Sequence, residues 1–253
     1  MQAAGLLDLE SRKHKAAGGY NCELPETGMP FIFMNASGTM LDVTTMVHEC
    51  GHAMHNFAMN ALTPHRHRAI PMEVAEVASM SMELFALPHI AAFGLNEEEI
   101  QRYLPTKLHK IIDTLCWISL IDSFQYRLYT TPHDRTMRKQ KRSDLHRSYY
   151  PEIDPSATPQ YEAIAWQKQG HIFSVPFYYI EYGIAQLAAL QMWKNYRADP
   201  AATIIQYQEF LKCGYTQIIP EIYRRGGIKF ALDQDAICEA LEVVTEVLGW
   251  TQG

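Results

Sequence analysis

Two histidines and a glutamate within five residues form a pattern that can bind and use a metal ion. The segment reads His48-Glu49-Cys50-Gly51-His52, an H-E-x-x-H pattern. On a helix, residues four apart lie on one face, so the imidazoles of His48 and His52 can bind a single Zn²⁺. Glu49 points about 100° around the helix from His48, where it can face a metal-bound water as a general base. The pattern therefore predicts a hydrolytic zinc site.

The alternative interpretation is an amphipathic helix that carries these residues without a metal. The chain has 11 histidines in 253 residues, and the full pattern would arise by chance in about one such sequence in a hundred. Burying two imidazoles and a carboxylate without partners would also cost free energy. A bound metal removes that cost, so the sequence favours the zinc site.

A catalytic zinc needs a third protein ligand and leaves its fourth position to water. The metzincin pattern is excluded, because His55 and Ala58 stand where that class has glycine and histidine. Farther along the chain, Glu73, Glu76 and Glu83 are spaced three and seven residues apart. A helix would place all three carboxylates on one face, turned toward the first helix. Spacing alone does not choose among them.

Both segments are predicted to be helices, over residues 39–60 and 71–85. Thr39 and Asp42 form a pair like a capping box, and apolar residues follow at helical spacing. Residues 30–35 form the best strand candidate in the chain. We predict a mainly α fold with a short edge strand or small sheet before the H-E-x-x-H helix. Further helices are predicted over residues 96–129, 143–149, 175–196, 201–212 and 233–248.

Composition excludes several classes of protein. The chain is 47% hydrophobic and 20% charged, which indicates packed globular structure. Its net charge of −6 provides no basic field for a nucleic acid. No apolar run approaches the roughly 20 residues that cross a bilayer. The start has no secretory signal, and five scattered cysteines indicate a reducing compartment without disulfides. We expect a cytoplasmic protein.

One dense basic cluster stands out against this acidic background: Arg135, Arg138, Lys139, Lys141 and Arg142. No aromatic residues are interleaved with these cations, as they would be in a nucleic-acid site. We therefore interpret the cluster as a solvated loop without a functional role.

The motifs, taken in order, resemble a known family. Residues 48–55 (H-E-C-G-H-A-M-H) and 76–83 (E-V-A-S-M-S-M-E) are similar to the zinc site of the thimet oligopeptidase and oligoendopeptidase F family. Residues 12–20 (R-K-H-K-A-A-G-G-Y) resemble the family's segment upstream of its edge strand. Residues 170–182 (G-H-I-F-S-V-P-F-Y-Y-I-E-Y) resemble its substrate-side region. The Phe-Tyr-Tyr-Ile form of that region points to the oligoendopeptidase F branch.

The resemblance implies a zincin-like catalytic domain that binds one Zn²⁺ per chain and hydrolyses peptide bonds in short oligopeptides. It implies that Glu76 is the third metal ligand, beside His48 and His52. It also implies that Glu83 orients a ligand histidine, and it leaves Glu73 without a role.

The same resemblance nominates His171, Tyr178 and Tyr182 as the groups that stabilise the oxyanion formed when the peptide carbonyl is attacked. Tyr179 is adjacent and can replace Tyr178 in this role. Without the resemblance, aromatic residues at helical spacing would be interpreted as core.

Members of the family are about twice as long as this chain. The resemblance therefore implies that residues 1–253 are one catalytic domain, corresponding to the C-terminal half of the family architecture. A separate N-terminal half or a second copy of the chain are the candidate protein partners. The rival hypothesis is a noncatalytic, zinc-containing module that binds peptides or assembles with a partner. In either case residues 31–35 could pair with an extended peptide by strand addition.

Overall fold

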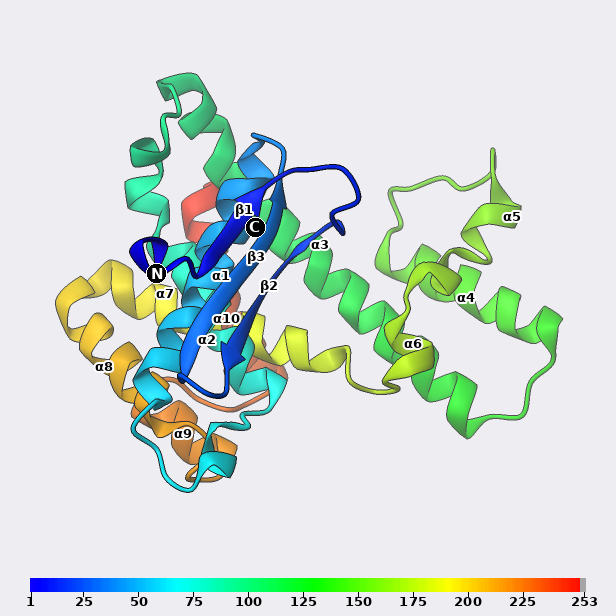
Figure 1. The fold of residues 1–253 in the computed structure, drawn as a ribbon. Coiled ribbons are helices and arrows are strands. Elements are labelled where there is room, and N and C mark those ends of the chain that lie inside the picture. Colours follow the sequence, from blue (N-terminus) through cyan, green and yellow to red (C-terminus); the bar gives the residue numbers. More distant parts are fainter. Residues whose placement is uncertain (251–253) are drawn as a thin grey trace. The chain divides into compact units, whose positions relative to one another are not determined.

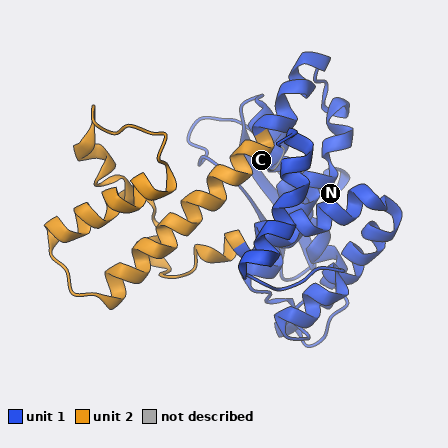
Figure 2. Cartoon of the chain, turned by 180° about the vertical axis from the view of Figure 1, so that it is seen from behind, with its two compact units in different colours: residues 1–106, 184–253 blue, residues 107–183 orange. Residues whose placement is uncertain are grey.

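The computed structural model describes residues 1–250, and the chain divides into two compact units (Figure 2). Unit 1 contains residues 1–106 together with the chain from residue 184 onward, and unit 2 contains residues 107–183. The fold is mainly helical, as the sequence predicts. That the whole chain acts as one catalytic domain stays a prediction.

Unit 1 carries a small sheet of three strands: β1 (Leu7–Glu10), β2 (Gly19–Leu24) and β3 (Met29–Ala36). Their order is β1-β3-β2, with β3 parallel to β1 and antiparallel to β2. The predicted strand at residues 30–35 and the predicted small sheet are thus confirmed, and of the two alternatives the edge position is wrong, because β3 is the central strand. Both sides of β3 already pair with a neighbouring strand, so it has no free backbone groups for an extended peptide.

Two helices lie behind this sheet in the view of Figure 1, α1 (Met40–Met59) and α2 (Met72–Phe85), close to the predicted bounds. At the start of α1, the Asp42 carboxylate accepts a hydrogen bond of 2.7 Å from the backbone N–H of Thr39. The sheet packs on α1 through the buried side chains of Ile32, Met34 and Ala53. The H-E-x-x-H helix is therefore held between the sheet and α2.

Gly51 permits a very close crossing of α1 and α2. A Cβ atom at this position would lie 2.6 Å from the Ser79 Cα and 2.7 Å from the Ala78 carbonyl oxygen. Both are backbone atoms of α2, so neither can rotate away. The glycine lies between the two histidines of the H-E-x-x-H pattern, and the close crossing therefore brings α2 directly beside them.

Two tyrosine hydroxyls from helices later in the chain also hold the backbone of α2. The Tyr207 hydroxyl donates a 2.7 Å hydrogen bond to the Ala78 carbonyl, and the Tyr223 hydroxyl donates one of 2.6 Å to the Glu73 carbonyl. Val74 and Val77 of α2 are completely buried in the surrounding apolar core.

The remaining α-helices are α3 (Glu97–Thr130), α4 (Arg135–Tyr149), α5 (Pro159–Glu162), α6 (His171–Ser174), α7 (Ile180–Ala198), α8 (Pro200–Cys213), α9 (Ile219–Arg225) and α10 (Gln234–Leu248). Short 3₁₀ helices are η1 (Gln2–Ala4), η2 (His65–Arg68), η3 (Leu87–Phe93) and η4 (Ala165–Lys168).

Unit 2 consists of most of α3, helices α4 to α6 and the first residues of α7. Its core includes the buried side chains of Leu120, Phe124 and Trp166. The basic cluster is helical, so its interpretation as a loop is wrong. Asp134 caps this helix by accepting a 2.8 Å hydrogen bond from the Met137 backbone N–H. The helix predicted over residues 175–196 begins later, at Ile180.

Two further findings concern the described residues 1–250. None of their helices is both long and apolar enough to cross a membrane. All five cysteines are free, as the scattered positions predict.

Candidate metal centre

Three side chains of unit 1 converge on one point between α1 and α2. The Glu76 Oε2 lies 3.3 Å from His48 Nε2 and 3.8 Å from His52 Nε2. Together they form a group whose ligand atoms all lie within 4.8 Å of one another. The two imidazole rings meet edge to face, with their centroids 4.9 Å apart. The fold thus brings together the two histidines that the H-E-x-x-H pattern predicts as ligands and the glutamate that the family resemblance implies.

The spacing of these atoms fits a single tetrahedral ion. Two ligand atoms at about 2.1 Å from a tetrahedral zinc lie about 3.4 Å from each other. The two distances from the Glu76 carboxylate to the imidazoles, 3.3 and 3.8 Å, are close to this value. Two imidazole nitrogens and one carboxylate oxygen also make the donor set of many catalytic zinc sites. The residues therefore fit the metal that the motif predicts.

Glu83 contacts the opposite side of one ligand ring. Its Oε1 lies 2.7 Å from His48 Nδ1. With the proton on Nδ1 donated to this carboxylate, the lone pair of Nε2 is free to face Glu76 and His52. Glu83 thus fixes both the orientation and the tautomer that metal binding requires.

Ser79 holds the Glu76 carboxylate. Its side chain is completely buried, and its hydroxyl lies 2.8 Å from Glu76 Oε2 as donor and 3.1 Å from the Glu76 carbonyl oxygen. The oxygen that it contacts is the one nearest both histidines. Ser79 follows Glu76 by about one turn of α2, which places its hydroxyl beside the Glu76 carboxylate. The contact restricts rotation of the Glu76 side chain.

Charges in the metal-free group are strongly coupled. Burial lowers the pKa of His48, but hydrogen bonds to Glu76 and Glu83 outweigh burial and raise it to about 10. Burial also raises the pKa of Glu76, and its contact with His48 reverses this, so that the net pKa is lowered. Burial lowers the pKa of His52 to about 4. At neutral pH the metal-free group therefore holds a protonated His48, a neutral His52 and an ionised Glu76.

Glu49 lies on α1 beside these residues and is only 6% exposed. Burial raises the pKa of its carboxyl, although the neighbouring His48 acts in the opposite direction. A carboxylate with a raised pKa is better matched to proton transfer near neutral pH than a fully solvated one.

Two other ionisable residues nearby do not belong to the group. His55 is 1% exposed, and neither ring nitrogen has a hydrogen-bond partner among the described residues. Its ring packs 6.1 Å from that of Phe210, and burial lowers its pKa to about 3, so it is a neutral core residue. Glu73, which spacing alone left open, is not part of the converging set.

His171, Tyr178, Tyr179 and Tyr182 gather in unit 2. The centroid of the His171 ring lies 6.0 Å from that of Tyr178, 5.0 Å from that of Tyr179 and 5.8 Å from that of Tyr182. Tyr179 packs against the apolar core of this unit, and burial raises its pKa. This packing favours Tyr178 over Tyr179 as the tyrosine available to a ligand. The metal group lies in unit 1, so the joint action of the two groups stays a prediction.

Sequence reasoning missed the residues that orient His171. Gln169 Nε2 lies 2.6 Å from His171 Nδ1, and Gln169 Oε1 accepts a 3.1 Å hydrogen bond from the Trp117 indole N–H. The indole can only donate, which assigns Oε1 as the acceptor and Nε2 as the donor. His171 therefore accepts at Nδ1 and carries its proton on Nε2, where it can donate to an oxyanion. Only the closeness of Gln169 to His171 in the sequence hinted at this chain of contacts.

Comparison with known proteins identifies one family over most of the chain. The model of peptidase family M3 matches residues 2–243. Oligopeptidase PepF of Bacillus subtilis (strain 168) is 23% identical over 244 residues, which are 93% of this chain and 36% of that protein. The oligoendopeptidase F homolog of Borreliella burgdorferi is 24% identical over 206 residues, covering 79% of this chain and 33% of that protein.

Solved structures agree with these sequence relatives. PZ peptidase A with an inhibitor superposes with a TM-score of 0.86 at 27% identity, over 100% of this chain and 45% of that one. A protein described as an oligoendopeptidase F gives a TM-score of 0.85 at 29% identity, again over 100% of this chain and 45% of the other. The chain therefore spans about a third of the length of the two sequence relatives and 45% of the length of these two solved structures.

Proposed function

Because the chain belongs to peptidase family M3, we propose that it carries the catalytic site of a zinc-dependent oligoendopeptidase that hydrolyses short peptides. The observation that carries the proposal is the convergence of His48, His52 and Glu76, with Glu49 beside them. We propose one Zn²⁺ per chain, held by the two Nε2 atoms and the Glu76 carboxylate. We also propose a cytoplasmic location, which the five free cysteines support.

In this proposal each residue has a distinct role. His48, His52 and Glu76 would hold the zinc, which when bound would supply an activated water and polarise the scissile carbonyl. Glu49 accepts a proton from the attacking water and delivers it to the leaving amine. His171, through its Nε2–H, and the hydroxyls of Tyr178 and Tyr182 donate hydrogen bonds to the oxyanion. Glu83 keeps His48 in the tautomer that binds metal.

Zinc binding should strengthen as the pH rises. The pKa of His48 is about 10 in the metal-free group, so zinc must displace one proton from this ring at neutral pH. The affinity should therefore increase about tenfold per pH unit between pH 7 and 9. His52, with a pKa of about 4, adds no further proton in this range. Competition with a calibrated chelator measures the affinity, and calorimetry in buffers of different ionisation enthalpy counts the protons. An affinity independent of pH would contradict this assignment.

Removing the Ser79 hydroxyl should weaken zinc binding without unfolding the protein. Ser79→Ala leaves the Glu76 carboxylate without its 2.8 Å hydrogen bond, and loss of such a supporting contact costs about 10- to 100-fold in metal affinity. Ser81→Ala is the matched control, since Ser81 lies on the same helix, is equally buried and has an unpartnered hydroxyl. Equal zinc affinities of the two variants would show that Ser79 does not support the ligand.

The function itself is tested with the purified chain and a quenched fluorescent peptide. We expect one zinc per chain and peptide cleavage that a zinc chelator stops and added zinc restores. The limited coverage of the longer relatives supports the alternative, a noncatalytic module that binds peptides or assembles with a separate N-terminal half or a second copy. One bound zinc without chelator-sensitive cleavage would favour that alternative.

A further inference from the structure

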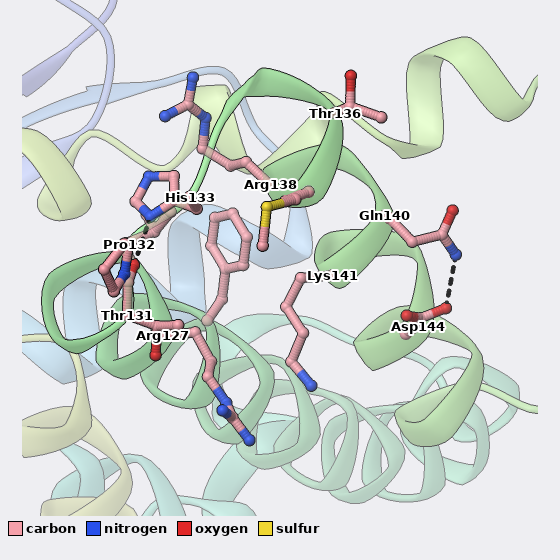
Figure 3. Close-up of a pocket in the computed structure, with 12 residues that line it drawn as sticks. Arg127, Thr131, Pro132, His133, Thr136, Arg138, Gln140, Lys141 and Asp144 are labelled. Atoms are coloured by element: carbon pink, nitrogen blue, oxygen red, sulfur yellow. Dashed lines mark hydrogen bonds between the residues drawn. The ribbon is translucent and has the colours of Figure 1, made fainter.

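Unit 2 contains a cavity that the proposed peptidase function does not use. Its volume is 460 Å³, which is within the range of about 300–1,000 Å³ typical of small-molecule sites. Figure 3 shows it between the end of α3, the turn that follows and the first turns of α4. All the lining residues belong to unit 2.

The wall of this cavity is apolar. Phe124 is completely buried, and Leu128 and Pro132 continue the apolar surface toward the turn. Met137 of α4 completes it and is itself 53% exposed. An apolar ligand that covers the exposed part of this wall, at Leu128, Pro132 and Met137, removes apolar surface from water, which is favourable.

The rim of the cavity is positively charged. Arg127, Arg138 and Lys141 line it, and none of these side chains has a hydrogen-bond or ion-pair partner among the described residues. The Arg127 and Lys141 side chains extend toward the same side in Figure 3, whereas the Arg138 side chain extends toward the opposite side. The lining carboxylate, Asp144, accepts a 2.8 Å hydrogen bond from Gln140 and forms a 3.2 Å ion pair with Arg147. The rim thus has unneutralised positive charge in a chain whose net charge is −6.

We propose that this cavity binds a small molecule with an apolar body and a single carboxylate. The apolar wall disfavours a fully hydrated ion such as phosphate, and the cationic rim disfavours an amine. A neutral apolar molecule would give no partner to Arg127 and Lys141, the two cations that extend to one side. A fatty-acid anion and an N-acylated apolar amino acid share the required chemistry.

Calorimetric titration of the 253-residue chain tests the charge requirement. Octanoate should bind saturably, whereas octylammonium and acetate should bind at least about tenfold more weakly, because one has the wrong charge and the other lacks the apolar body. N-acetylphenylalanine is titrated in parallel. Its affinity relative to that of octanoate shows whether the cavity prefers an N-acylated amino acid or a fatty-acid anion. The methyl resonance of Met137 should shift on binding of either carboxylate.

Variants locate the binding to this cavity. Lys141→Glu and Arg127→Glu should each weaken octanoate binding by about 3- to 10-fold near physiological salt. Lys139→Glu is the control, because Lys139 lies on the same helix with similar exposure but does not line the cavity. Met137→Gln should weaken binding of octanoate by removing part of the apolar wall.

The proposal would be overturned by any of three results. These are the absence of saturable carboxylate binding, equal affinity for octanoate and octylammonium, and an equal effect of Lys139→Glu and Lys141→Glu. None of these measurements depends on zinc or on peptide cleavage, so the result is independent of the proposed peptidase function.

Discussion

Replacing Glu49 with glutamine should lower the rate of peptide hydrolysis by about 10²- to 10⁴-fold, the usual contribution of a positioned general base. Glutamine has nearly the same shape but cannot accept a proton from water. Glu49 is 6% exposed and burial raises its pKa. Water from bulk solvent therefore has little access to this position and does not readily act as the base in place of Glu49. The variant should still bind one zinc, because Glu49 is not part of the converging ligand set.

Steady-state cleavage of a quenched peptide, together with zinc content, measures this effect. Glu73→Gln is the control, since Glu73 is a neighbouring glutamate outside the ligand set and its variant should cleave at nearly the normal rate. If Glu49→Gln retained most of the activity at normal zinc content, Glu49 would not be the base.

Substituting Gly51 by alanine should both destabilise unit 1 and weaken zinc binding. The added Cβ would lie 2.6 Å from the Ser79 Cα and 2.7 Å from the Ala78 carbonyl oxygen. Such overpacking costs about 1–3 kcal/mol. Because α2 must move away from α1, Glu76 would also move away from the two histidines, and zinc affinity should fall by at least about tenfold.

Thermal unfolding of the metal-free protein and zinc competition measure these two effects separately. Gly170→Ala is the control for the change of residue type, because Gly170 has ordinary helical dihedral angles and nothing within 4 Å of its added Cβ. It should keep normal stability and zinc affinity. An unchanged melting temperature and zinc affinity for Gly51→Ala would mean that the close crossing of α1 and α2 does not hold the centre together.

Features that depend on neighbouring residues alone follow from the sequence, and the start of α1 is one of them. The capping pair at Thr39 and Asp42 and the apolar spacing after it are local, and α1 forms close to the predicted residues. The sequence predicts only residues 143–149 of α4 (Arg135–Tyr149), because residues 135–142 have few apolar side chains to show a period. The local signal for its true start is the cap at Asp134.

The position of a strand within a sheet is not a local property. An apolar run revealed β3, whereas β1 and β2 are short and carry polar residues that hide their alternation. Whether β3 lies at an edge depends on which other segments pair with it. Strand addition to residues 31–35 was therefore a reasonable hypothesis from the sequence, and it is wrong because β1 and β2 occupy both sides.

The sequence by itself determined that His48 and His52 share one helix face with Glu49 beside them, because helix geometry fixes the directions of residues one and four apart. It did not choose Glu76 over Glu73 or Glu83 by spacing, and that choice rested on family resemblance. Tertiary structure decided which carboxylate meets the imidazoles, through the close crossing at Gly51 and the hydroxyl of Ser79. Contacts between helices depend on how side chains pack across the crossing, and packing is a property of the whole fold.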